Sequence, residues 1–362
     1  MSRRSIVPFG PQHPVLPEPI HLDLVLEDER VVEAIPSIGF VHRGLEKLVE
    51  KREYTEYVYV AERICGICSF QHGSGYCQAV EAIMNVEIPP RAEFLRTIWA
   101  ELSRMHSHLL WLGLLADAFG FESLFYQCWR LRERVLDIFE MTTGGRVIFS
   151  VCKVGGVRRD ISADDMKRII TVLDGIVADL RDFERVFFDN NTVKSRLCGV
   201  GVLSKEKILE LGAVGPVARG SGIKIDMRNL GYAAYDKIPG VEPIIETAGD
   251  CYARCLVRLR EIYQSVDIIK AAASVMPEGE ISIKIAANQA PNGEFFSRVE
   301  QPRGEAIYYV RGNGTKFLER FRVRTPTFAN LGALLATLPG CDLADVPMLV
   351  LTIDPCISCT ER

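Results

Sequence analysis

Two Cys-x-x-Cys pairs are the residues of this chain best suited to chemistry. Cys65 and Cys68 form the first pair, and Cys356 and Cys359 form the second, three residues before Arg362. Two intervening residues let both thiolates of a pair face one ion, so two pairs can supply four sulfur ligands. Because the pairs stand near opposite ends of the chain, only the folded protein can bring them together. The spacing therefore predicts a metal site that joins the two ends.

Several simpler uses of these cysteines compete with a catalytic metal. Structural zinc usually stabilises small folds that lack a core, and this chain has ample core. A thioredoxin-like motif would leave one pair unexplained, whereas a lone iron–sulfur cluster is chemically possible. On spacing alone, zinc and a redox metal both stay open. His72 follows Cys68 by four residues and could donate a ring N–H to a sulfur, which favours the redox metal, although a lone histidine is more often an ordinary polar group.

Composition describes a globular protein without a nucleic-acid surface. The chain has 362 residues, 48% of them hydrophobic and 25% charged, with a net charge of −4. This charge and the lack of Lys/Arg blocks argue against nucleic acid as a partner. No apolar segment follows Arg3 and Arg4, so a signal peptide is not predicted. The 11 cysteines therefore belong to a reducing compartment, where paired cysteines more often bind metal than form disulfides.

The longest uncharged run and the remaining cysteines have structural explanations. The run Thr325–Cys341 contains Pro326, Pro339 and Asn330, which makes it a poor bilayer span. Five further cysteines are expected to be small buried hydrophobes: Cys77, Cys128, Cys152, Cys198 and Cys341.

Long helices must position the cysteines. From Pro90, apolar residues recur at spacings of three and four through Leu112, which places them on one helical stripe. Helices are also predicted over Ser123–Thr142, Ser162–Asp189 and Gly249–Ala273, with Ser162 as an N-cap. These segments predict a central bundle of long helices.

Strands are predicted at both ends of this bundle. His21–Leu26 and Arg30–Ile35 alternate around a turn and predict a hairpin. Ile281–Ile285, Ala306–Val310 and Phe317–Val323 predict a second β segment, the last two joined by a turn at residues 312–314. The expected fold is mainly α with small β-sheets, in a single domain over residues 1–362. Its parts are an N-terminal β part (1–60), a helical core (90–275) and a mixed part (280–362) that ends in the metal-binding tail.

As a set, the cysteine segments resemble the large subunit of nickel–iron hydrogenases. Residues 62–68 with His72 resemble the motif R-x-C-G-x-C-x-x-x-H, and residues 354–362 resemble D-P-C-x-x-C-x-x-H/R. Residues 42–46 look like the R-G-x-E segment of the family, residues 301–305 its P-R-G segment, and residues 324–327 its turn beside the iron.

The N-terminal segment Gly-Pro-Gln-His-Pro at residues 10–14 narrows the resemblance. It is similar to the membrane-bound, energy-converting branch, of the Ech and CO-induced type. That branch is related to the quinone-site subunit of respiratory complex I, which shares this segment but lacks the cysteine pairs. The cysteines therefore favour a hydrogenase over a quinone-binding homologue.

The resemblance implies a ligand set and a reaction. Cys65 and Cys356 would bind nickel terminally, while Cys68 and Cys359 would bridge nickel and an iron that carries carbon monoxide and cyanide. Soft thiolates suit these metals. The reaction is the heterolytic cleavage or formation of H₂, and Cys356 is the expected first proton acceptor.

Other matched residues would serve this centre. Arg303, after Pro302, would lie above the open metal position and pair with Asp354, and Thr327 would donate to a cyanide. Glu46 matches the proton-relay carboxylate, and burial would raise its pKa. Without the motif, Arg43 and Glu46 would be an ordinary solvated helix face.

The resemblance also implies partners. No cysteines remain for a cluster in this chain, so a small subunit with an iron–sulfur cluster would exchange the electrons with ferredoxin. Further hydrophilic subunits and a membrane arm would move H⁺ or Na⁺, with this chain peripheral on the cytoplasmic side of the membrane. Family members are usually made with a C-terminal extension that is removed after the last His or Arg, and this chain ends at Arg362. The alternative is a catalytically silent or quinone-reactive complex I-like subunit with a structural zinc at the four cysteines.

Overall fold

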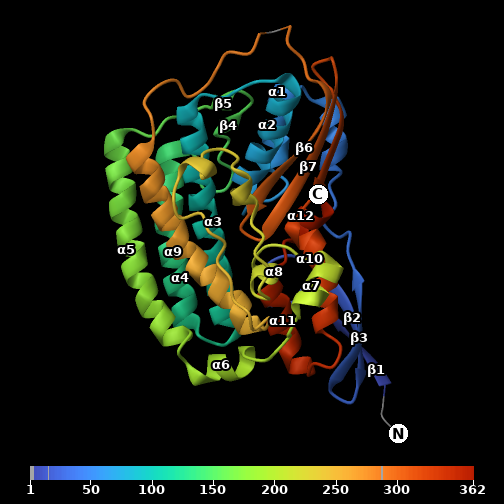
Figure 1. Cartoon of the computed structure of the whole chain (residues 1–362). Coiled ribbons are helices and arrows are strands. Elements are labelled where there is room, and N and C mark those ends of the chain that lie inside the picture. Colours follow the sequence, from blue (N-terminus) through green and yellow to red (C-terminus); the bar gives the residue numbers. More distant parts are fainter. Residues whose placement is uncertain (1–3, 15, 287) are drawn as a thin grey trace.

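Four long helices run along one another through the centre of the molecule (Figure 1). They are α3 (Pro90–Ala118), α4 (Glu122–Thr143), α5 (Ala163–Phe187) and α9 (Cys251–Val275). The computed structural model describes residues 4–14, 16–286 and 288–362. Helix α3 contacts α4 and α9, and α5 contacts the same two helices from the outside. The predicted central bundle is therefore present.

Each helix of the bundle follows from its sequence. The Ser162 side chain accepts a hydrogen bond from the Asp165 backbone N–H and caps α5 as predicted. In α3, Phe94, Ile98 and Leu102 are buried on the predicted apolar stripe. However, polar side chains on the other faces of α3 are buried too, which the stripe does not predict. Helix α3 therefore lies inside the protein on every side.

Two three-stranded antiparallel sheets flank the bundle. β1 (Arg4–Phe9), β2 (His21–Glu27) and β3 (Arg30–Ser37) form one, so the predicted hairpin exists and gains a third strand. β6 (Asn292–Gln301), β7 (Gly304–Asn313) and β8 (Leu318–Arg324) form the other. Helix α2 (Ser69–Met84) packs against β6 and β7 and so fixes the second sheet against the helices.

The strand predicted at Ile281–Ile285 is wrong. In this segment only Ser282 makes a β-bridge, to Gly156, because its neighbour there is the two-residue strand β5 (Gly156–Val157). β6 takes the place beside β7, and all ten of its residues have a partner in that strand. Continuous pairing along a long neighbour stabilises a strand more than one isolated bridge does.

Shorter elements connect the bundle and the sheets. The final apolar run forms helix α11 (Val346–Ile353), which contacts α3 and α9. The remaining elements are α1 (Tyr54–Glu62), α6 (Asn191–Leu197), α7 (Lys205–Leu211), α8 (Pro216–Arg219), α10 (Pro326–Thr337), α12 (Ile357–Glu361), β4 (Cys152–Lys153) and the 3-10 helices Leu45–Lys51, Met227–Leu230, Tyr235–Lys237 and Leu343–Asp345.

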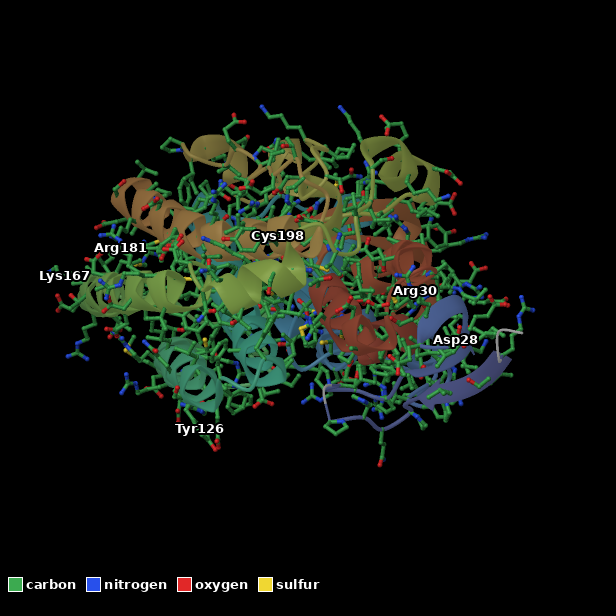
Figure 2. All side chains as sticks on the ribbon, turned by 90° about the horizontal axis from the view of Figure 1, so that it is seen from below. Asp28, Arg30, Tyr126, Lys167, Arg181 and Cys198 are labelled. Atoms are coloured by element: carbon green, nitrogen blue, oxygen red, sulfur yellow. The ribbon has the colours of Figure 1, made fainter. Side chains whose placement is uncertain are left out.

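One continuous hydrophobic core extends from Phe9 to Cys359. Cys77, Cys128 and Cys152 are buried in it as predicted. The expectation is wrong for Cys198, which is exposed after α6 at the lower end of the molecule (Figure 2), and Cys341 is only half-buried. Within the described residues, no helix has the length and apolarity needed to cross a membrane.

Candidate metal centre

The four cysteines meet in the interior. Cys65 and Cys68 lie in the turn between α1 and α2, and Cys356 and Cys359 lie where α11 gives way to α12. The Sγ atoms of Cys65 and Cys356 are 3.3 Å apart, and those of Cys68 and Cys359 are also 3.3 Å apart. Each thiol is at most 3% exposed. The fold thus brings the two cysteine pairs, which lie near opposite ends of the chain, into contact through their sulfur atoms.

Arg43 fastens the two cysteine turns to each other. Its guanidinium donates to the carbonyls of Arg63 and Ile64 at 2.8 Å and to the carbonyl of Ser358 at 3.0 Å. The first two carbonyls directly precede Cys65, and the third directly precedes Cys359. Arg43 therefore has a positioning role, and its motif match was a better guide than its surface-like sequence context.

The spacing of the thiols is compatible with their binding a shared metal ion. Three of them, Cys65, Cys68 and Cys359, have Sγ atoms within 4.8 Å of one another, and Cys356 joins the group through Cys65. Sulfurs bound tetrahedrally to one ion lie roughly 3.8 Å apart for a metal–sulfur bond of about 2.3 Å. Buried thiols at this spacing, with no apolar side chain between them, have the donor set and the geometry of a thiolate metal site.

The thiols also differ electrostatically. Burial raises the pKa of Cys359 well above its ordinary value. At Cys68, burial acts in the same direction, but hydrogen bonds from the other three thiols outweigh it and lower the pKa well below its ordinary value. Thiols this close together share their protons, and a metal cation that binds the sulfurs displaces these protons.

His72 lies beside the second pair. Its Nε2 atom is 3.4 Å from the Cys359 sulfur, and its Nδ1 atom is 2.9 Å from the Tyr308 hydroxyl. Gly75 of α2 makes room for the Tyr308 ring, since a Cβ atom there would lie 2.4 Å from it. The predicted contact of His72 with a sulfur is therefore present, and β7 orients the ring through Tyr308.

Arg303 and Asp354 form the predicted ion pair at the centre. Arg303 Nη2 donates to Asp354 Oδ1 at 2.8 Å, Nε donates to the Asp354 carbonyl at 2.9 Å, and Nη1 donates to Ser107 Oγ at 3.2 Å. Burial alone would lower the pKa of Arg303, but Asp354 and the nearby thiols raise it well above its ordinary value. The guanidinium is therefore charged at every physiological pH.

The backbone at Arg303 and Asp354 is specialised. Asp354 adopts a left-handed conformation (φ 55°), which few non-glycine residues tolerate. Gly304 approaches Gly215 so closely that a Cβ atom would lie 2.7 Å from the Gly215 Cα. The P-R-G segment therefore needs its glycine for packing, while Pro302 precedes Arg303 in the buried turn between β6 and β7.

Thr327 holds the second cysteine turn. Its Oγ1 atom accepts a hydrogen bond from the Cys356 backbone N–H at 3.0 Å. Thr325 donates to the Cys359 carbonyl at 3.1 Å from the start of the same helix, α10. Both threonines thus fix the backbone that carries the sulfur ligands.

Glu46 does not have the environment expected of it. Its carboxylate accepts from Arg362 Nε at 2.8 Å, from the Val323 N–H at 2.9 Å and from Arg322 Nη1 at 2.5 Å. Burial would raise its pKa, but these donors outweigh burial and lower the pKa instead. The prediction of a raised pKa is therefore wrong, because two arginines from distant parts of the chain surround the carboxylate.

Glu18 is a carboxylate at the centre that the sequence analysis missed. It accepts hydrogen bonds from the backbone N–H groups of Ile357 and Ser358, the latter at 3.0 Å, and from the Ser358 hydroxyl. These are the two residues that follow Cys356. Pro17 and Pro19 flank Glu18 and restrict its backbone, which is the signal that could have found it.

Glu62 is a second missed carboxylate. It is fully buried, and its Oε2 atom accepts from the Ser150 N–H at 2.9 Å and the Ser150 hydroxyl at 3.1 Å. Oε1 has no hydrogen-bond partner among the described residues, although it lies close to Gly73 of α2. Burial raises the pKa of Glu62 to about 7. Glu62 begins the matched cysteine motif, three residues before Cys65.

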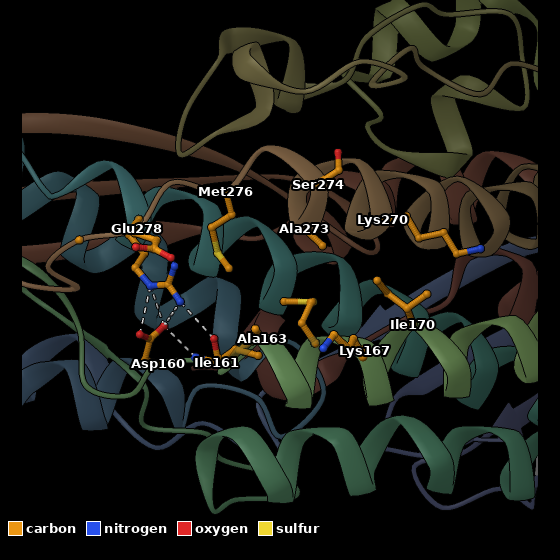
Figure 3. A pocket seen from close by; sticks show the side chains of 13 residues that line it. Asp160, Ile161, Ala163, Lys167, Ile170, Lys270, Ala273, Ser274, Met276 and Glu278 are labelled. Atoms are coloured by element: carbon orange, nitrogen blue, oxygen red, sulfur yellow. Dashed lines mark hydrogen bonds and ion pairs between the residues drawn. The ribbon is translucent and has the colours of Figure 1, made fainter.

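A surface pocket lies away from the cysteine centre. It has a volume of about 610 Å³ and is lined by residues at the start of α5 and the end of α9 and beside them, including Asp160, Lys167, Lys270 and Met276 (Figure 3). None of the four cysteines, Arg303 or Asp354 lines it. The cysteine centre and this pocket are therefore separate features of the molecule.

Two families match different parts of the chain. Nickel-dependent hydrogenases match residues 43–117, and the 49 Kd subunit of respiratory-chain NADH dehydrogenase matches residues 118–289 and 282–362. Membrane-bound hydrogenase subunit alpha of Pyrococcus furiosus is 40% identical over 98% of this chain and 87% of that protein. Carbon monoxide-induced hydrogenase of Rhodospirillum rubrum is 38% identical over 98% of this chain and 99% of that protein.

The fold is shared with a solved respiratory complex. A chain of the membrane-bound sulfane sulfur reductase, an archaeal respiratory membrane complex, superimposes with a TM-score of 0.94 at 32% identity. The match covers 99% of this chain and 98% of that chain.

Proposed function

The chain belongs to the family in which large subunits of membrane-bound nickel-dependent hydrogenases are joined to the 49 Kd subunit of NADH dehydrogenases, and on this premise we propose that it catalyses the interconversion of H₂ with protons and electrons. The observation that carries this proposal is the convergence of two distant Cys-x-x-Cys pairs into one buried group. Quinone reduction by itself does not require four converging thiols, whereas a thiolate-bound metal centre does.

The donor set fits a nickel–iron centre. The four cysteines Cys65, Cys68, Cys356 and Cys359 would hold this centre through their thiolates, which are soft ligands that suit nickel and iron. When bound, this centre, with carbon monoxide and cyanide on its iron, would split H₂ heterolytically. Structural zinc would use the same thiols but would have no need of a buried arginine above them.

The surrounding side chains would orient and polarise the centre. Arg303 is held in place by Asp354 and Ser107 and would present a fixed positive charge to bound H₂. Thr327 would fix the Cys356 turn and direct its hydroxyl to an iron ligand. His72 would donate a hydrogen bond to the Cys359 sulfur and so tune its electron density.

A proton acceptor must lie beside Cys356, the expected first base. Glu18 contacts the two residues that follow Cys356, and a carboxylate there could take the proton from the thiol. Glu46 is the relay predicted from the motif, but its carboxylate already neutralises Arg322 and Arg362. We therefore favour Glu18 as the relay and assign Glu46 to holding the C-terminal arginine.

The electrons would leave through other chains. We propose a small subunit with an iron–sulfur cluster beside the centre, ferredoxin as the external partner, and further subunits with a membrane arm that moves H⁺ or Na⁺. The support is that the relatives in Pyrococcus furiosus and Rhodospirillum rubrum are hydrogenases, the former described as membrane-bound. The chain would then lie peripherally on the cytoplasmic side of the membrane.

Metal analysis combined with infrared spectroscopy tests this function. The purified complex should contain one nickel and one iron per chain, with infrared bands from carbon monoxide and cyanide, and Cys65→Ser should abolish both. Zinc alone in active protein would instead support the structural-zinc alternative. Activity that survives Cys65→Ser, without nickel, would identify a quinone-reactive subunit.

A further inference from the structure

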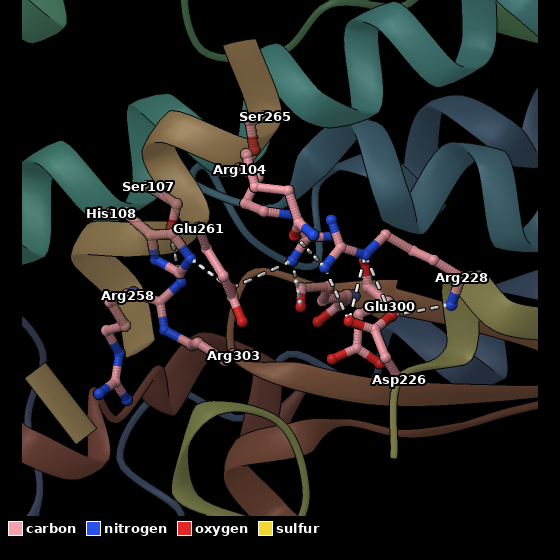
Figure 4. A network of polar contacts seen from close by, with 12 residues as sticks. Arg104, Ser107, His108, Asp226, Arg228, Arg258, Glu261, Ser265, Glu300 and Arg303 are labelled. Carbon is pink, nitrogen blue, oxygen red and sulfur yellow. Dashed lines mark hydrogen bonds and ion pairs between the residues drawn. The ribbon is translucent and has the colours of Figure 1, made fainter. Parts of the chain in front are cut away.

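A network of charged side chains lies next to the centre, inside the helix bundle (Figure 4). All of its members are at most 2% exposed except Asp226, at 4%. It comprises four carboxylates and three guanidiniums: Glu101, Asp226, Glu261, Glu300, Arg104, Arg219 and Arg228.

Arg219 and Arg228 organise the network. Arg219 of α8 donates to Glu261 of α9 at 2.7 and 3.0 Å and to Glu300 of β6 at 2.8 Å. Arg228 binds Asp226 through both its Nε and Nη2 atoms. These two arginines therefore link α8 and the segment around Asp226 to α9 and β6, which are distant in sequence.

The network carries one more negative charge than positive when every carboxylate is ionised. Four carboxylates face three guanidiniums, and His108, which contacts Glu261 at 2.9 Å, stays neutral because burial lowers its pKa. The arginines of the cysteine centre, Arg303 and Arg258, make their ion pairs with Asp354, and the charge of Arg258 also acts on Glu261 at longer range. An unbalanced negative charge in a dry interior is costly, so the network is expected to bind one proton.

Glu300 is the carboxylate with the weakest cationic support. Glu261 receives two bonds from Arg219 and one from His108, and Asp226 is bound by Arg228 through two nitrogen atoms and lies 3.5 Å from Arg219. Glu300 has one bond from Arg219, which it shares, and one from the Met227 N–H at 3.0 Å.

The remaining carboxylate, Glu101, does not compete with Glu300 for the proton. It accepts from the Tyr235 and Ser265 hydroxyls at 2.6 Å each and lies beside Arg104 and Arg228. Burial and the neighbouring charge of Asp226 raise the pKa of Glu300 to about 7, while the pKa of Glu101 is lowered, since its arginines outweigh burial.

The backbone of Glu300 makes contacts toward both the centre and the surface. On one side, Arg104 donates to the carbonyls of Glu300 and Gln301, and Gln301 contacts His72. On the other side, the Glu300 N–H donates to the Tyr232 hydroxyl at 3.0 Å. Tyr232 lines an open surface pocket of about 460 Å³.

We propose that Glu300 holds an exchangeable proton within this network and releases it to solvent when the cysteine centre becomes more positively charged. The step converts a carboxylic acid to a carboxylate plus one H⁺ and transfers no electron. The coupling to the centre rests on the proposed hydrogenase function, but the protonation of Glu300 does not.

Infrared difference spectroscopy of the purified complex tests both parts. The measurement uses a Glu62→Gln background, which removes the other carboxyl group whose pKa is about 7. Between acidic and alkaline pH, a protonated carboxyl band should then decrease to half near pH 7, and it should be absent when Glu300→Gln is added and return with Glu300→Asp. Glu242→Gln, at an exposed position on the same side, is the matched control and should leave the band unchanged. A band that persists in Glu300→Gln would overturn the proposal.

A second comparison assigns the proton within the network. Glu300→Gln replaces a neutral acid by a neutral amide and should leave thermal stability nearly unchanged at pH 6. Asp226→Asn should lower it clearly, because it leaves Arg228 without its bidentate partner. The reverse order would place the proton on Asp226 and refute the assignment.

Reduction with H₂ separates the two proposals. If both hold, H₂ should shift the carbon monoxide and cyanide bands and increase the Glu300 carboxyl band in the same spectra. Shifted iron-ligand bands without a Glu300 response would refute the coupling and leave the hydrogenase function intact. A pH-dependent Glu300 band without any iron-ligand bands would refute the hydrogenase function and leave the protonation of Glu300 intact.

Discussion

Two carboxylates contact the C-terminal tail, and their surroundings give them different chemistry. Glu18 accepts from backbone and hydroxyl groups, none of which carries a charge. Glu46 is bound by two arginines, which lower its pKa and keep its carboxylate ionised. A relay group must gain and lose a proton near the working pH, and the two arginines oppose this at Glu46.

Substituting each of the two carboxylates tests this difference. Glu18→Gln should slow H₂/D₂ exchange by about 100-fold with unchanged nickel content, as expected for loss of a general base. Glu46→Gln should change exchange less than about threefold, since the relay is retained, but should lower the free energy of unfolding by about 1–2 kcal/mol. A strong loss of exchange in Glu46→Gln alone, with metal intact, would restore Glu46 as the relay.

Glu62 makes stability depend on pH. Its pKa is about 7 in the folded protein and near 4.5 when unfolded, so the folded state binds more protons between these values. Stability should therefore fall as pH rises from about 4.5 through 7, by a total of about 3 kcal/mol from this residue. Chemical denaturation at pH 5 and pH 8 should show a smaller difference for Glu62→Gln than for the native protein; an equal difference would contradict the assignment.

At the scale of elements, the packing of α2 against the β6–β8 sheet positions the side chains that surround the cysteine sulfurs. β7 supplies Tyr308, which orients His72, and β6 supplies the carbonyls that receive Arg104. The position of Tyr308 needs the close approach that Gly75 permits. A small change in the distance between helix and sheet would therefore reach the cysteine centre.

Gly75→Ala tests this packing. The added methyl group would lie 2.4 Å from the Tyr308 ring, which must move and take its hydrogen bond from His72. Overpacking of this kind costs about 1–3 kcal/mol, and thermal unfolding should record it. The centre's infrared bands should shift as well. Gly332→Ala in α10, where a Cβ would meet only Leu211 at 3.6 Å, is the control and should change neither measurement.

At the scale of the whole molecule, the cysteine centre closes the chain on itself. The Glu361 side chain accepts from the Gly39 and Val41 N–H groups, and Arg362 pairs with Glu46. The segment 39–46 therefore holds the last two residues beside the sulfurs, while the helices α3, α4, α5 and α9 pack against one another in the bundle.

Metal removal should loosen this closure without unfolding the bundle. We expect backbone amides of residues 356–362 and 39–46 to exchange with D₂O at least about tenfold faster in metal-free protein, because four thiols no longer share an ion. Amides of α3 and α9 should keep their protection. Hydrogen-exchange mass spectrometry measures both, and equal acceleration in the bundle would mean that the metal stabilises the entire fold.

The sequence by itself determined the four cysteines, the long helices and the family resemblance, because each rests on residue types at short spacing. The structure confirmed the predicted helices: α5 begins after Ser162, and α3 buries its apolar stripe. The Ile281–Ile285 strand failed, since a strand depends on a partner that local pattern does not specify.

Tertiary structure decided the chemistry of the carboxylates. The pKa of Glu46 depends on Arg322 and Arg362, and that of Glu300 on Arg219 and Asp226, all distant in sequence. Glu18 likewise contacts the cysteine centre only because the two ends of the chain meet. Charge interactions depend on distances in space, so spacing along the chain identified the metal ligands but could not tell which acids would hold a proton.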